Sequence, residues 1–322
     1  MTSFWQKILK PILVQAPMEG VTDVIFREML GLCSRPAVFF TEFVNVEGLN
    51  SEGRERLLPK LKFTSRQRPI VAQIWGNNPD NFTKTAKMLV KMDFDGIDLN
   101  MGCPDKAVIK MGCGGALISN HRLASEIFLA AKKGACSLPV SIKTRIGFDK
   151  IETEKWIGFL LEQNPDVIII HGKTVTGKDK KKTDWEEIGK AVRLRNKLKS
   201  QTFIIGNGDI TSLYQAKELA EKYGLDGIMI GRAMISNFWI FNEKLEPEKI
   251  PQRDKLKLLI KHLELAKKYY GNHASFNPLK KYFRNYISGY EGANELRVNL
   301  MKQPSIEEAI KKLLSVIASE TQ

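Results

Sequence analysis

The sequence predicts an α/β fold in which a (β/α)8 barrel is followed by a smaller helical domain. Short apolar runs recur at intervals of about 25 to 35 residues with amphipathic stretches between them, an alternation typical of parallel α/β folds. Eight such runs favour a closed barrel over an open sheet. After Trp239 this pattern gives way to helical periodicity with many charges. We therefore expect a barrel domain over residues 1–242 and a helical domain over residues 243–322.

Several of the expected strands are apolar at every position, as is typical of strands that are covered on both faces. We place the eight strands at residues 12–16, 37–41, 70–74, 96–99, 140–143, 167–170, 202–205 and 227–230. The helices between them are expected at residues 21–30, 79–91, 122–133, 153–163, 185–199 and 212–223.

The C-terminal region is expected to hold three helices, at residues 254–270, 278–290 and 305–318. Pro247 and Pro251 indicate a linker before them. The region is strongly basic through Arg253, Lys255, Lys257, Lys261, Lys267, Lys268, Lys280, Lys281, Arg284 and Arg297. Charge runs of this kind usually form solvated helix faces. The interleaved aromatic residues either pack in a core or meet nucleic-acid bases; they are Tyr269, Tyr270, Phe276, Tyr282, Phe283, Tyr286 and Tyr290.

Composition narrows the class of partner and the compartment. A formal charge of +14 and a pI near 9.5 favour an anionic partner such as nucleic acid, although a lysine-rich surface alone also raises both values. The four cysteines, Cys33, Cys103, Cys113 and Cys136, lack close paired spacing, which argues against a zinc site and a disulfide framework. Residues 1–15 lack the long apolar run of a signal peptide or membrane span. We expect a soluble, cytoplasmic protein without a metal.

Polar or unusual residues follow nearly every expected strand. They are Pro17, Met18 and Glu19, then Glu42, Gln73, Asn100 with Cys103, Lys143 with Arg145, His171, Asn207 with Gly208 and Asp209, and Gly231 with Arg232. All of them lie at carboxyl ends of strands, where TIM-barrel enzymes build their active sites. The sequence therefore predicts one active site at this end of the barrel.

The stretch Asn100-Met101-Gly102-Cys103-Pro104 places a thiol on a stiff loop directly after the fourth strand. Gly102 permits backbone angles that are closed to other residues, and Pro104 fixes the turn after the thiol. A free cysteine is commonly just a small buried hydrophobe. Its polar neighbours here favour a chemical role for Cys103.

This stretch, together with Gly112-Cys113-Gly114-Gly115, resembles the active-site signature of the tRNA-dihydrouridine synthases. The resemblance extends as an ordered set of motifs from Pro11 to Arg232. At His171-Gly172-Lys173-Thr174 a lysine replaces the usual arginine, so we assign no site role to Lys173. The other matching motifs are Ala16 to Asp23, Thr41-Glu42-Phe43, Gln73-Ile74-Trp75-Gly76 and Lys143-Thr144-Arg145-Ile146-Gly147.

Loops after the seventh and eighth strands of such barrels commonly bind phosphate through backbone N–H groups, to which Arg232 would add donors. No GxGxxG fingerprint lies between a strand and a helix, so a mononucleotide fits better than a dinucleotide. The resemblance implies FMN. It also implies the cofactor-binding residues Pro17, Met18, Glu19, Gln73, Lys143, His171, Asn207, Gly208, Asp209, Gly231 and Arg232.

The reaction that the resemblance implies is reduction of the C5=C6 bond of selected uridines in tRNA, with NADPH or NADH as the electron donor. Cys103 would donate the proton to C5, because a thiol with a pKa of about 8.5 is mostly protonated at neutral pH. Lys143 would stabilise the reduced flavin, and Asn100 and Arg145 would bind the uracil base. His171 would help to orient the base, unless it only makes a structural hydrogen bond. We expect a monomer that binds tRNA.

Two other functions fit part of the pattern. A dihydropyrimidine- or dihydroorotate-type dehydrogenase would share the phosphate loops and a cysteine but would not need the basic tail. A binding protein built on a decayed barrel would not retain Gln73, Cys103, Lys143, His171 and Asn207 together. We expect the basic loop from Lys178 to Lys182 to be exposed to solvent without a ligand; the alternative is that it contacts phosphate.

Overall fold

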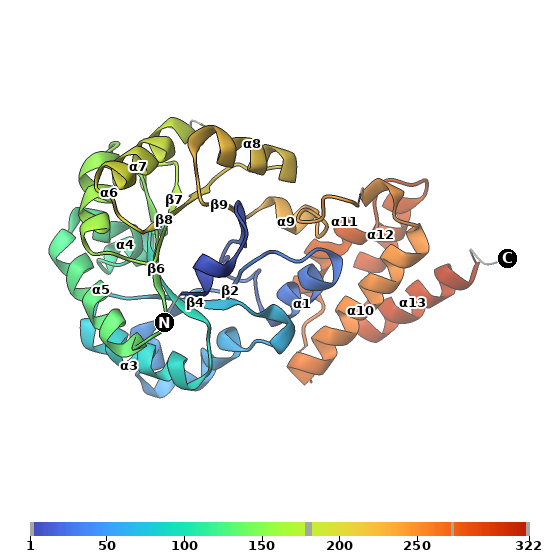
Figure 1. The fold of residues 1–322 in the computed structure, drawn as a ribbon. Helices are drawn as coiled ribbons and strands as arrows, with labels where there is room; N and C mark the ends of the chain where they lie inside the picture. Colours follow the sequence, from blue (N-terminus) through green and yellow to red (C-terminus); the bar gives the residue numbers. More distant parts are fainter. Residues whose placement is uncertain (1–2, 178–181, 246, 272–273, 320–322) are drawn as a thin grey trace. The chain divides into compact units, whose positions relative to one another are not determined.

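The structure is a computed structural model that describes residues 3–177, 182–245, 247–271 and 274–319. Its internal contacts divide the chain into two units (Figure 1). The barrel unit comprises Met1–Val24 and Pro36–Gly231, and the helical unit comprises Ile25–Arg35 and Arg232–Gln322. The expected domain boundary after residue 242 stays a prediction, since compactness alone does not show which segment folds independently.

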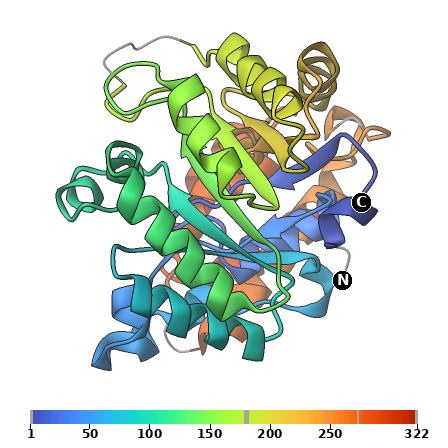
Figure 2. The same cartoon turned by 60° about the vertical axis from the view of Figure 1, so that its left-hand side comes forward.

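The barrel unit is built on one sheet in which every ladder is parallel. In Figure 2 its strands run through the middle of the unit with the helices outside. The strand order is β1-β9-β8-β7-β6-β5-β4-β2, and β3 also pairs with β4, so that β2 and β3 share one of eight positions. The bounds are β1 Ile12–Gln15, β2 Phe39–Phe40, β3 Val44–Asn45, β4 Ile70–Trp75, β5 Gly96–Met101, β6 Val140–Arg145, β7 Val167–His171, β8 Phe203–Asn207 and β9 Gly227–Ile230.

Hydrogen bonds between β1 and the segment before β2 close the ring. Ala37 N–H donates to Leu13 O across 2.8 Å, and Gln15 N–H donates to Val38 O across 3.0 Å. The interior is apolar along β1 and β7 to β9, where side chains such as Val14, Ile169 and Met229 pack together. The expected barrel is therefore confirmed, and each of the eight expected strands overlaps an observed one.

Helices cover the outside of the sheet, and local capping explains where several of them begin. The side chains of Asn78, Asn120, Asp184 and Ser212 accept N–H groups of the first turns of α3, α5, α7 and α8. The bounds are α3 Pro79–Lys91, α5 His121–Ala135, α6 Thr153–Glu162, α7 Trp185–Lys197 and α8 Leu213–Tyr223. Short elements occupy the loops: η1 Phe4–Lys7, α2 Val46–Leu49, η2 Glu52–Arg56, η3 Leu58–Leu61, η4 Ser65–Gln67, α4 Lys106–Lys110 and η5 Gly114–Ser119.

Aspartates stand directly before alternate strands at the amino-terminal end of the barrel. Asp95, Asp166 and Asp226 precede β5, β7 and β9. Each carboxylate accepts a backbone N–H at the start of the neighbouring strand, from Ile70 at 2.8 Å, Val140 at 3.0 Å and Ile204 at 2.8 Å respectively. The three aspartates therefore fix strand starts on this rim, which in barrels serves stability rather than chemistry.

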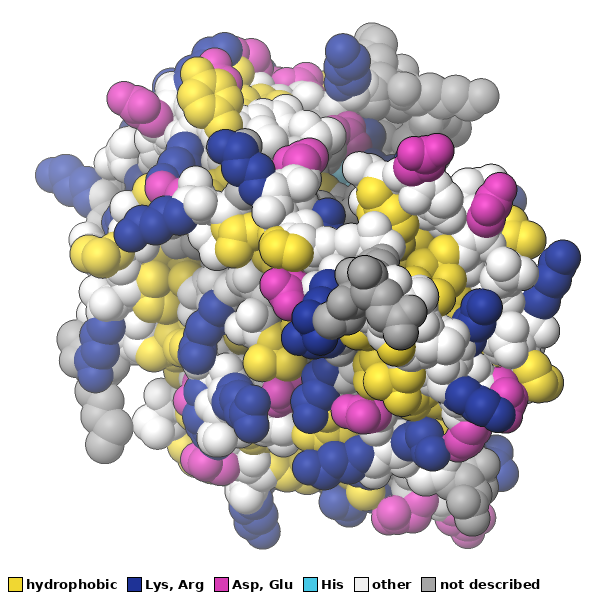
Figure 3. All heavy atoms as spheres, turned by 90° about the vertical axis from the view of Figure 1, so that its right-hand side faces the viewer, with side chains coloured by type: hydrophobic (Ala, Val, Ile, Leu, Met, Phe, Trp, Pro, Cys, Tyr) yellow, Lys and Arg dark blue, Asp and Glu magenta, His cyan; other side chains and the backbone are white. Residues whose placement is uncertain are grey.

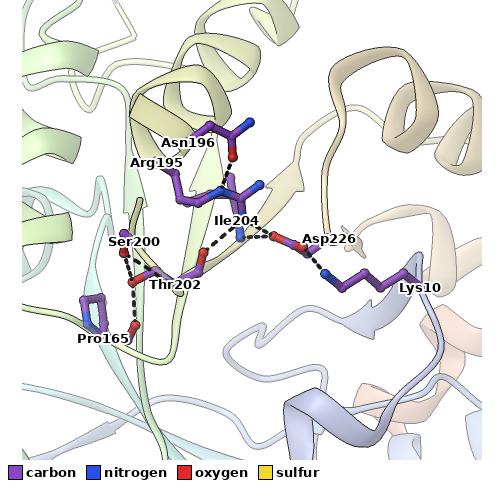
Figure 4. A network of polar contacts seen from close by, with 8 residues as sticks. All are labelled: Lys10, Pro165, Arg195, Asn196, Ser200, Thr202, Ile204 and Asp226. Carbon is purple, nitrogen blue, oxygen red and sulfur yellow. Dashed lines mark hydrogen bonds and ion pairs between the residues drawn. The ribbon is translucent and has the colours of Figure 1, made fainter. Parts of the chain in front are cut away.

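Asp226 has the most developed of these networks (Figure 4). Its carboxylate is 6% exposed and binds Arg195 at 2.9 Å and Lys10 at 2.5 Å. Arg195 also donates to Thr202 O at 3.1 Å. One side chain thus links the segment before β1, the end of α7 and the starts of β8 and β9.

The helical unit contains one helix from early in the chain, α1 (Val24–Cys33), most of which belongs to it. Phe26 of α1 packs edge-on against Phe238 with ring centroids 5.1 Å apart, and Ser34 Oγ donates to Phe238 O at 2.6 Å. The buried His262 shares a 2.9 Å hydrogen bond with Tyr286 in the same core. The other elements are α9 Ala233–Ser236, η6 Pro247–Lys249, α10 Gln252–Tyr270, η8 Asn277–Tyr282, α11 Phe283–Tyr286, α12 Ala293–Met301 and α13 Ile306–Ser319.

The helix expected at residues 278–290 is wrong as a single element. The structure has η8 followed by the short α11, and α12, which was not expected, begins after two glycines with left-handed backbone, Gly289 (φ 84°) and Gly292 (φ 77°). Glycine adopts this conformation readily, and these two residues belong to the connection between the end of α11 and the start of α12. Across the described ranges, no helix is both long enough and apolar enough to cross a membrane.

Candidate active site

A pocket of about 140 Å³ lies at the carboxyl ends of the barrel strands. It brings together seven residues that the sequence predicted for the site: Pro17, Gln73, Asn100, Cys103, Lys143, Arg145 and His171. Phe43, Gly102 and Pro104 complete the lining. Residues from six separate strands and loops therefore converge on one small space.

The loop that carries Cys103 is held by the side chain of Asn100. Its Oδ1 atom accepts the backbone N–H of Cys103 at 2.9 Å and that of Gly102 at 3.2 Å. The glycines that follow allow close approach, because Gly115 N–H donates to Cys103 O at 3.0 Å and a Cβ on Gly115 would lie 2.9 Å from that oxygen. The backbone at Cys103 is thus fixed from both sides.

The thiol of Cys103 is half-buried at the edge of this pocket. Burial raises the pKa of Cys103, and this outweighs the hydrogen bond from the backbone of Asp105 and the nearby charges of Arg145 and Lys143, which lower it. The thiol is consequently protonated at neutral pH. It has the protonation state of a proton donor rather than of a nucleophile.

Lys143 on β6 reaches across the barrel mouth to Asn207 at the end of β8, with 3.2 Å between Nζ and Oδ1. Burial and the neighbouring Arg145 lower the pKa of Lys143 to about 8, although Asp98 and Cys103 act in the opposite direction. At neutral pH the side chain is therefore a cation that loses its charge in mildly alkaline solution.

Arg145 and His171 stand side by side on β6 and β7. Arg145 donates from Nε to Gly102 O at 2.8 Å and from Nη1 to Thr174 O at 2.9 Å, which ties the Cys103 loop to the loop after β7. Burial and then the cations Lys143, Arg145 and Lys173 lower the pKa of His171 to about 2. His171 is therefore a neutral hydrogen-bonding group in this pocket.

Asp209 uses its carboxylate within the protein. It binds Lys173 at 2.8 Å and accepts from Thr183 Oγ1 at 2.9 Å. Burial raises the pKa of Asp209, but these hydrogen bonds prevail and lower it to about 2. Lys173, for which no site role was expected, therefore joins the loops after β7 and β8.

The remaining residues of the prediction lie outside the pocket lining. Met18 N–H donates to Thr22 Oγ1 at 2.9 Å, and Glu19 pairs with Lys60. Arg232 is the N-cap residue of α9 in the helical unit. Of the basic loop 178–182 only Lys182, which is exposed, falls within the described residues. The roles expected for Met18, Glu19 and Arg232 stay predictions.

The polar groups of the pocket suit hydrogen bonding to the ring of a flavin. The lining offers the amides of Gln73 and Asn100 and the cation Lys143. At the end of β9, a Cβ on Gly231 would make only ordinary contacts, with Ala16 Cβ at 3.6 Å and Met18 Sδ at 3.9 Å. A glycine backbone at such a strand end suits a phosphate.

Asp98 on β5 is a site-associated residue that the sequence analysis missed. Its carboxylate is fully buried and accepts from Gln73 Nε2 at 2.7 Å. The signal that could have revealed it is an acidic residue inside an otherwise apolar strand, two positions before Asn100.

Comparison with known proteins gives concordant matches. The model of the family described as "Dihydrouridine synthase (Dus)" matches residues 14–321. The chain is 41% identical over 310 residues to a probable tRNA-dihydrouridine synthase of Staphylococcus aureus (strain COL), covering 95% of this chain and 93% of the relative. It is 39% identical over 309 residues to probable tRNA-dihydrouridine synthase 2 of Bacillus subtilis (strain 168), covering 95% and 94% respectively.

Among solved structures, histamine dehydrogenase from Rhizobium sp. 4-9 has a similar fold. The TM-score is 0.52 at 14% sequence identity, and the match covers 79% of this chain and 49% of the other. This likeness supports the barrel architecture alone.

Proposed function

The chain belongs to the dihydrouridine synthase family, and from this premise we propose that it is an FMN-dependent tRNA-dihydrouridine synthase. It reduces the C5=C6 bond of uridines in tRNA to 5,6-dihydrouridine with NADPH or NADH as the electron donor. The observation that carries the proposal is the protonated, half-buried thiol of Cys103 in one pocket with Gln73, Lys143 and His171.

The proposed chemistry divides between the cofactor and the protein. Reduced FMN, when bound, would supply the hydride for C6 of the uracil ring. The thiol of Cys103 gives its proton to C5, and the resulting thiolate regains a proton from solvent. The amides of Gln73 and Asn100 would help to hold the flavin and the base, and the neutral His171 adds a further hydrogen-bonding group.

The cationic Lys143 has the role of an electrostatic stabiliser in this proposal. It is the cation in the pocket lining whose charge titrates near neutral pH, and it stabilises negative charge that develops beside it. Around the flavin phosphate we propose the backbone of Gly208 and Gly231 with Arg232, and near the ring Pro17, Met18, Glu19, Asn207 and Asp209.

The helical unit supports tRNA rather than a free base as the substrate. Arg253, Lys257, Lys261 and Lys268 are exposed and recur at helical spacing along one face of α10. Figure 3 shows a face on which Lys and Arg side chains are spread among acidic and apolar ones. Four of the aromatic residues considered for base stacking are instead buried in the core: Phe276, Tyr282, Phe283 and Tyr286.

Some basic residues of this unit serve its own structure. Lys255 is only 6% exposed, Lys280 donates to Met301 O at 2.7 Å, and Arg297 donates to Ile287 O at 2.6 Å. The RNA-binding surface that we propose therefore excludes them. It consists of the exposed row on α10.

The test is to purify the protein, record its flavin absorbance and incubate it with NADPH and unmodified tRNA. We expect dihydrouridine in the digested tRNA by mass spectrometry and no turnover of free uracil or dihydroorotate. Turnover of a free base without tRNA binding at low salt would favour a free-base dehydrogenase. A protein that cannot be reconstituted with FMN would be an RNA-binding scaffold. Mapping dihydrouridine in cells that lack the protein identifies the uridine position.

A further inference from the structure

A row of polar side chains crosses the barrel interior beneath the pocket. Asp98 on β5 stands opposite Gln73 on β4 and Ser141 on β6 in the strand register. All three are buried, with Asp98 and Gln73 at 0% and Ser141 at 1% exposure. Asn100 lies two residues further along β5, on the same side of the strand as Asp98. The row is thus placed directly beneath a residue that lines the pocket.

The hydrogen bonds that Asp98 accepts determine which end of the Gln73 and Asn100 amides, oxygen or nitrogen, faces each neighbour. An ionised carboxylate can only accept, and here it accepts from Ser141 Oγ at 2.5 Å and from Gln73 Nε2 at 2.7 Å. Gln73 must therefore turn its Oε1 atom away from Asp98, and this atom accepts from Asn100 Nδ2 at 3.0 Å. The Oδ1 atom of Asn100 is then left for the N–H groups of Gly102 and Cys103.

The sense of the relay is fixed from both ends, by the carboxylate of Asp98, which must accept, and by the backbone N–H groups of Gly102 and Cys103, which must donate. The oxygen and nitrogen ends of an amide group have nearly the same shape, so without Asp98 the orientation of Gln73 and Asn100 would be held from one end alone. A reversed Asn100 would present its NH₂ group to the N–H of Cys103, and two donors cannot bond. The position of the Cys103 backbone therefore depends on a residue two hydrogen-bonded side chains away.

Asp98 also interacts electrostatically with Lys143, which lies two residues after Ser141 on β6 and therefore on the same side of that strand, facing Asn100 in the register. Burial raises the pKa of Asp98 to about 6, while Ser141, Gln73 and Lys143 lower it. The negative charge of Asp98 in turn raises the pKa of Lys143 against burial and Arg145. Both groups are consequently charged at neutral pH.

We propose that Asp98 is a positioning residue of this site: its carboxylate orients the amides of Gln73 and Asn100, holds the backbone of Cys103 and balances the charge of Lys143. The charge-balancing part rests on the proposed function, because it is read out in the reaction. The part that concerns the Cys103 loop is independent of the reaction.

Hydrogen exchange of the protein as purified tests the loop. In Asp98→Asn, which keeps the shape and removes the charge, the amides of Gly102 and Cys103 should exchange about tenfold faster, the equivalent of one hydrogen bond. Ser141→Ala leaves the relay toward Cys103 intact and should not change this exchange. Asp226→Asn makes the same chemical change at the other end of the barrel and should also leave it unchanged.

If Asp98→Asn does not fold, Gln73→Met cuts the relay between Asp98 and Asn100 and should give the same acceleration. Unchanged exchange at Gly102 and Cys103 in the folded variant overturns the orienting role. The same acceleration in Asp226→Asn would also overturn it, because the effect would then be a general loosening of the barrel.

The pH profile of uridine reduction by the pre-reduced enzyme tests the charge. The rate should fall at alkaline pH as Lys143 loses its proton. In Asp98→Asn the lysine loses the nearby negative charge that raises its pKa, so this alkaline limb of the profile should move down by about one pH unit. A merely structural change would lower the rate at every pH and leave the limb in place, which would overturn the charge-balancing role. If the wild-type protein forms no dihydrouridine, the proposed function has failed, and hydrogen exchange still decides the orienting role.

Discussion

The ammonium group of Lys143 donates a 3.2 Å hydrogen bond to the side-chain oxygen of Asn207, across the intervening strand β7. Asn207 in turn donates from Nδ2 to Met229 O at 2.8 Å on β9, which fixes the orientation of its amide. A neutral partner holds the lysine in place without the large rise in pKa that a carboxylate would cause. Lys143 can therefore change its charge close to physiological pH.

We predict that flavin reduction by NADPH slows as pH rises through about 8, because Lys143 is cationic below this pKa and neutral above it. Lys143→Met should lower the rate of flavin reduction by ~10²-fold and remove the decline of this rate at alkaline pH, which we call the alkaline limb. Asn207→Asp should shift the limb to higher pH, because an adjacent carboxylate stabilises the ammonium form. Stopped-flow absorbance between pH 6 and 10 measures all three. A limb that persists in Lys143→Met would refute the assignment.

Cys103→Ala should lower the rate of dihydrouridine formation by ~10² to 10⁴-fold, because the proton donor to C5 is lost. Flavin absorbance and tRNA affinity should remain, since the backbone at residue 103 rather than the thiol bonds to Asn100 and Gly115. Mass spectrometry of digested tRNA measures the product. Cys136→Ser, at an exposed cysteine, is the matched control and should retain full activity. Full activity in Cys103→Ala would remove the thiol from the mechanism.

Gly231→Ala should weaken FMN binding by tenfold or more while leaving the fold intact. Its added Cβ makes only ordinary contacts with Ala16 and Met18, so a loss of affinity would reflect the ligand that we place there. Gly53→Ala, whose Cβ would also make only an ordinary contact, is the control. Fluorescence titration of the apoprotein with FMN gives the affinity, and unfolding gives the stability. Equal FMN affinity in the two variants would mean that the phosphate lies elsewhere.

Asp226→Asn should destabilise the protein by ~2 kcal/mol, chiefly because Arg195, which is 15% exposed, loses its buried carboxylate partner; the pair with Lys10, which is 52% exposed, adds less. Asp166→Asn is the comparison. Its carboxylate is 22% exposed and lies 3.7 Å from Lys132, so its loss should cost less. Urea unfolding followed by circular dichroism measures both. If the two substitutions lower the free energy of unfolding equally, the ion pairs of Asp226 add nothing to stability at this end of the barrel.

The double variant Lys261→Glu/Lys268→Glu should bind tRNA at least tenfold more weakly, with a salt slope smaller by about 2, if each lysine contacts one phosphate. Lys91→Glu/Lys197→Glu carries the same charge change on the last residues of α3 and α7 and should bind tRNA normally. Filter binding over a range of salt concentrations measures both. A similar loss in the two double variants would indicate only an effect of net charge.

The barrel was predictable because parallel strands covered on both faces must be apolar throughout. Residues 79–91 were even assigned to a helix with its observed bounds, since Asn78 and Pro79 signal its start in the sequence. The two-residue strand β3 was not foreseeable, because it exists only through pairing with β4. The error over residues 278–290 arose because helical periodicity does not reveal that the segment begins as the 3-10 helix η8 and that α11 already ends before Ile287.

For the site, the sequence predicted which strand ends meet but not how their charges pair. Asp209 and Glu19 are acidic residues of the kind that commonly bind ligands. Each of them instead forms an ion pair with a lysine from another loop, Lys173 and Lys60 respectively. Such partners depend on the path of the loops in three dimensions. Asp98 was overlooked because strand position alone does not reveal a hydrogen-bond relay.

The membership of α1 in the helical unit has a consequence during synthesis on the ribosome. Phe26 and its neighbours are translated between the first two barrel strands, but their packing partners Phe238 and Tyr282 emerge only after the last strand. Until then the packing partners of this apolar segment have not been synthesised. A fragment cut at residue 243 would leave the C-terminal helices without the segment that completes their core.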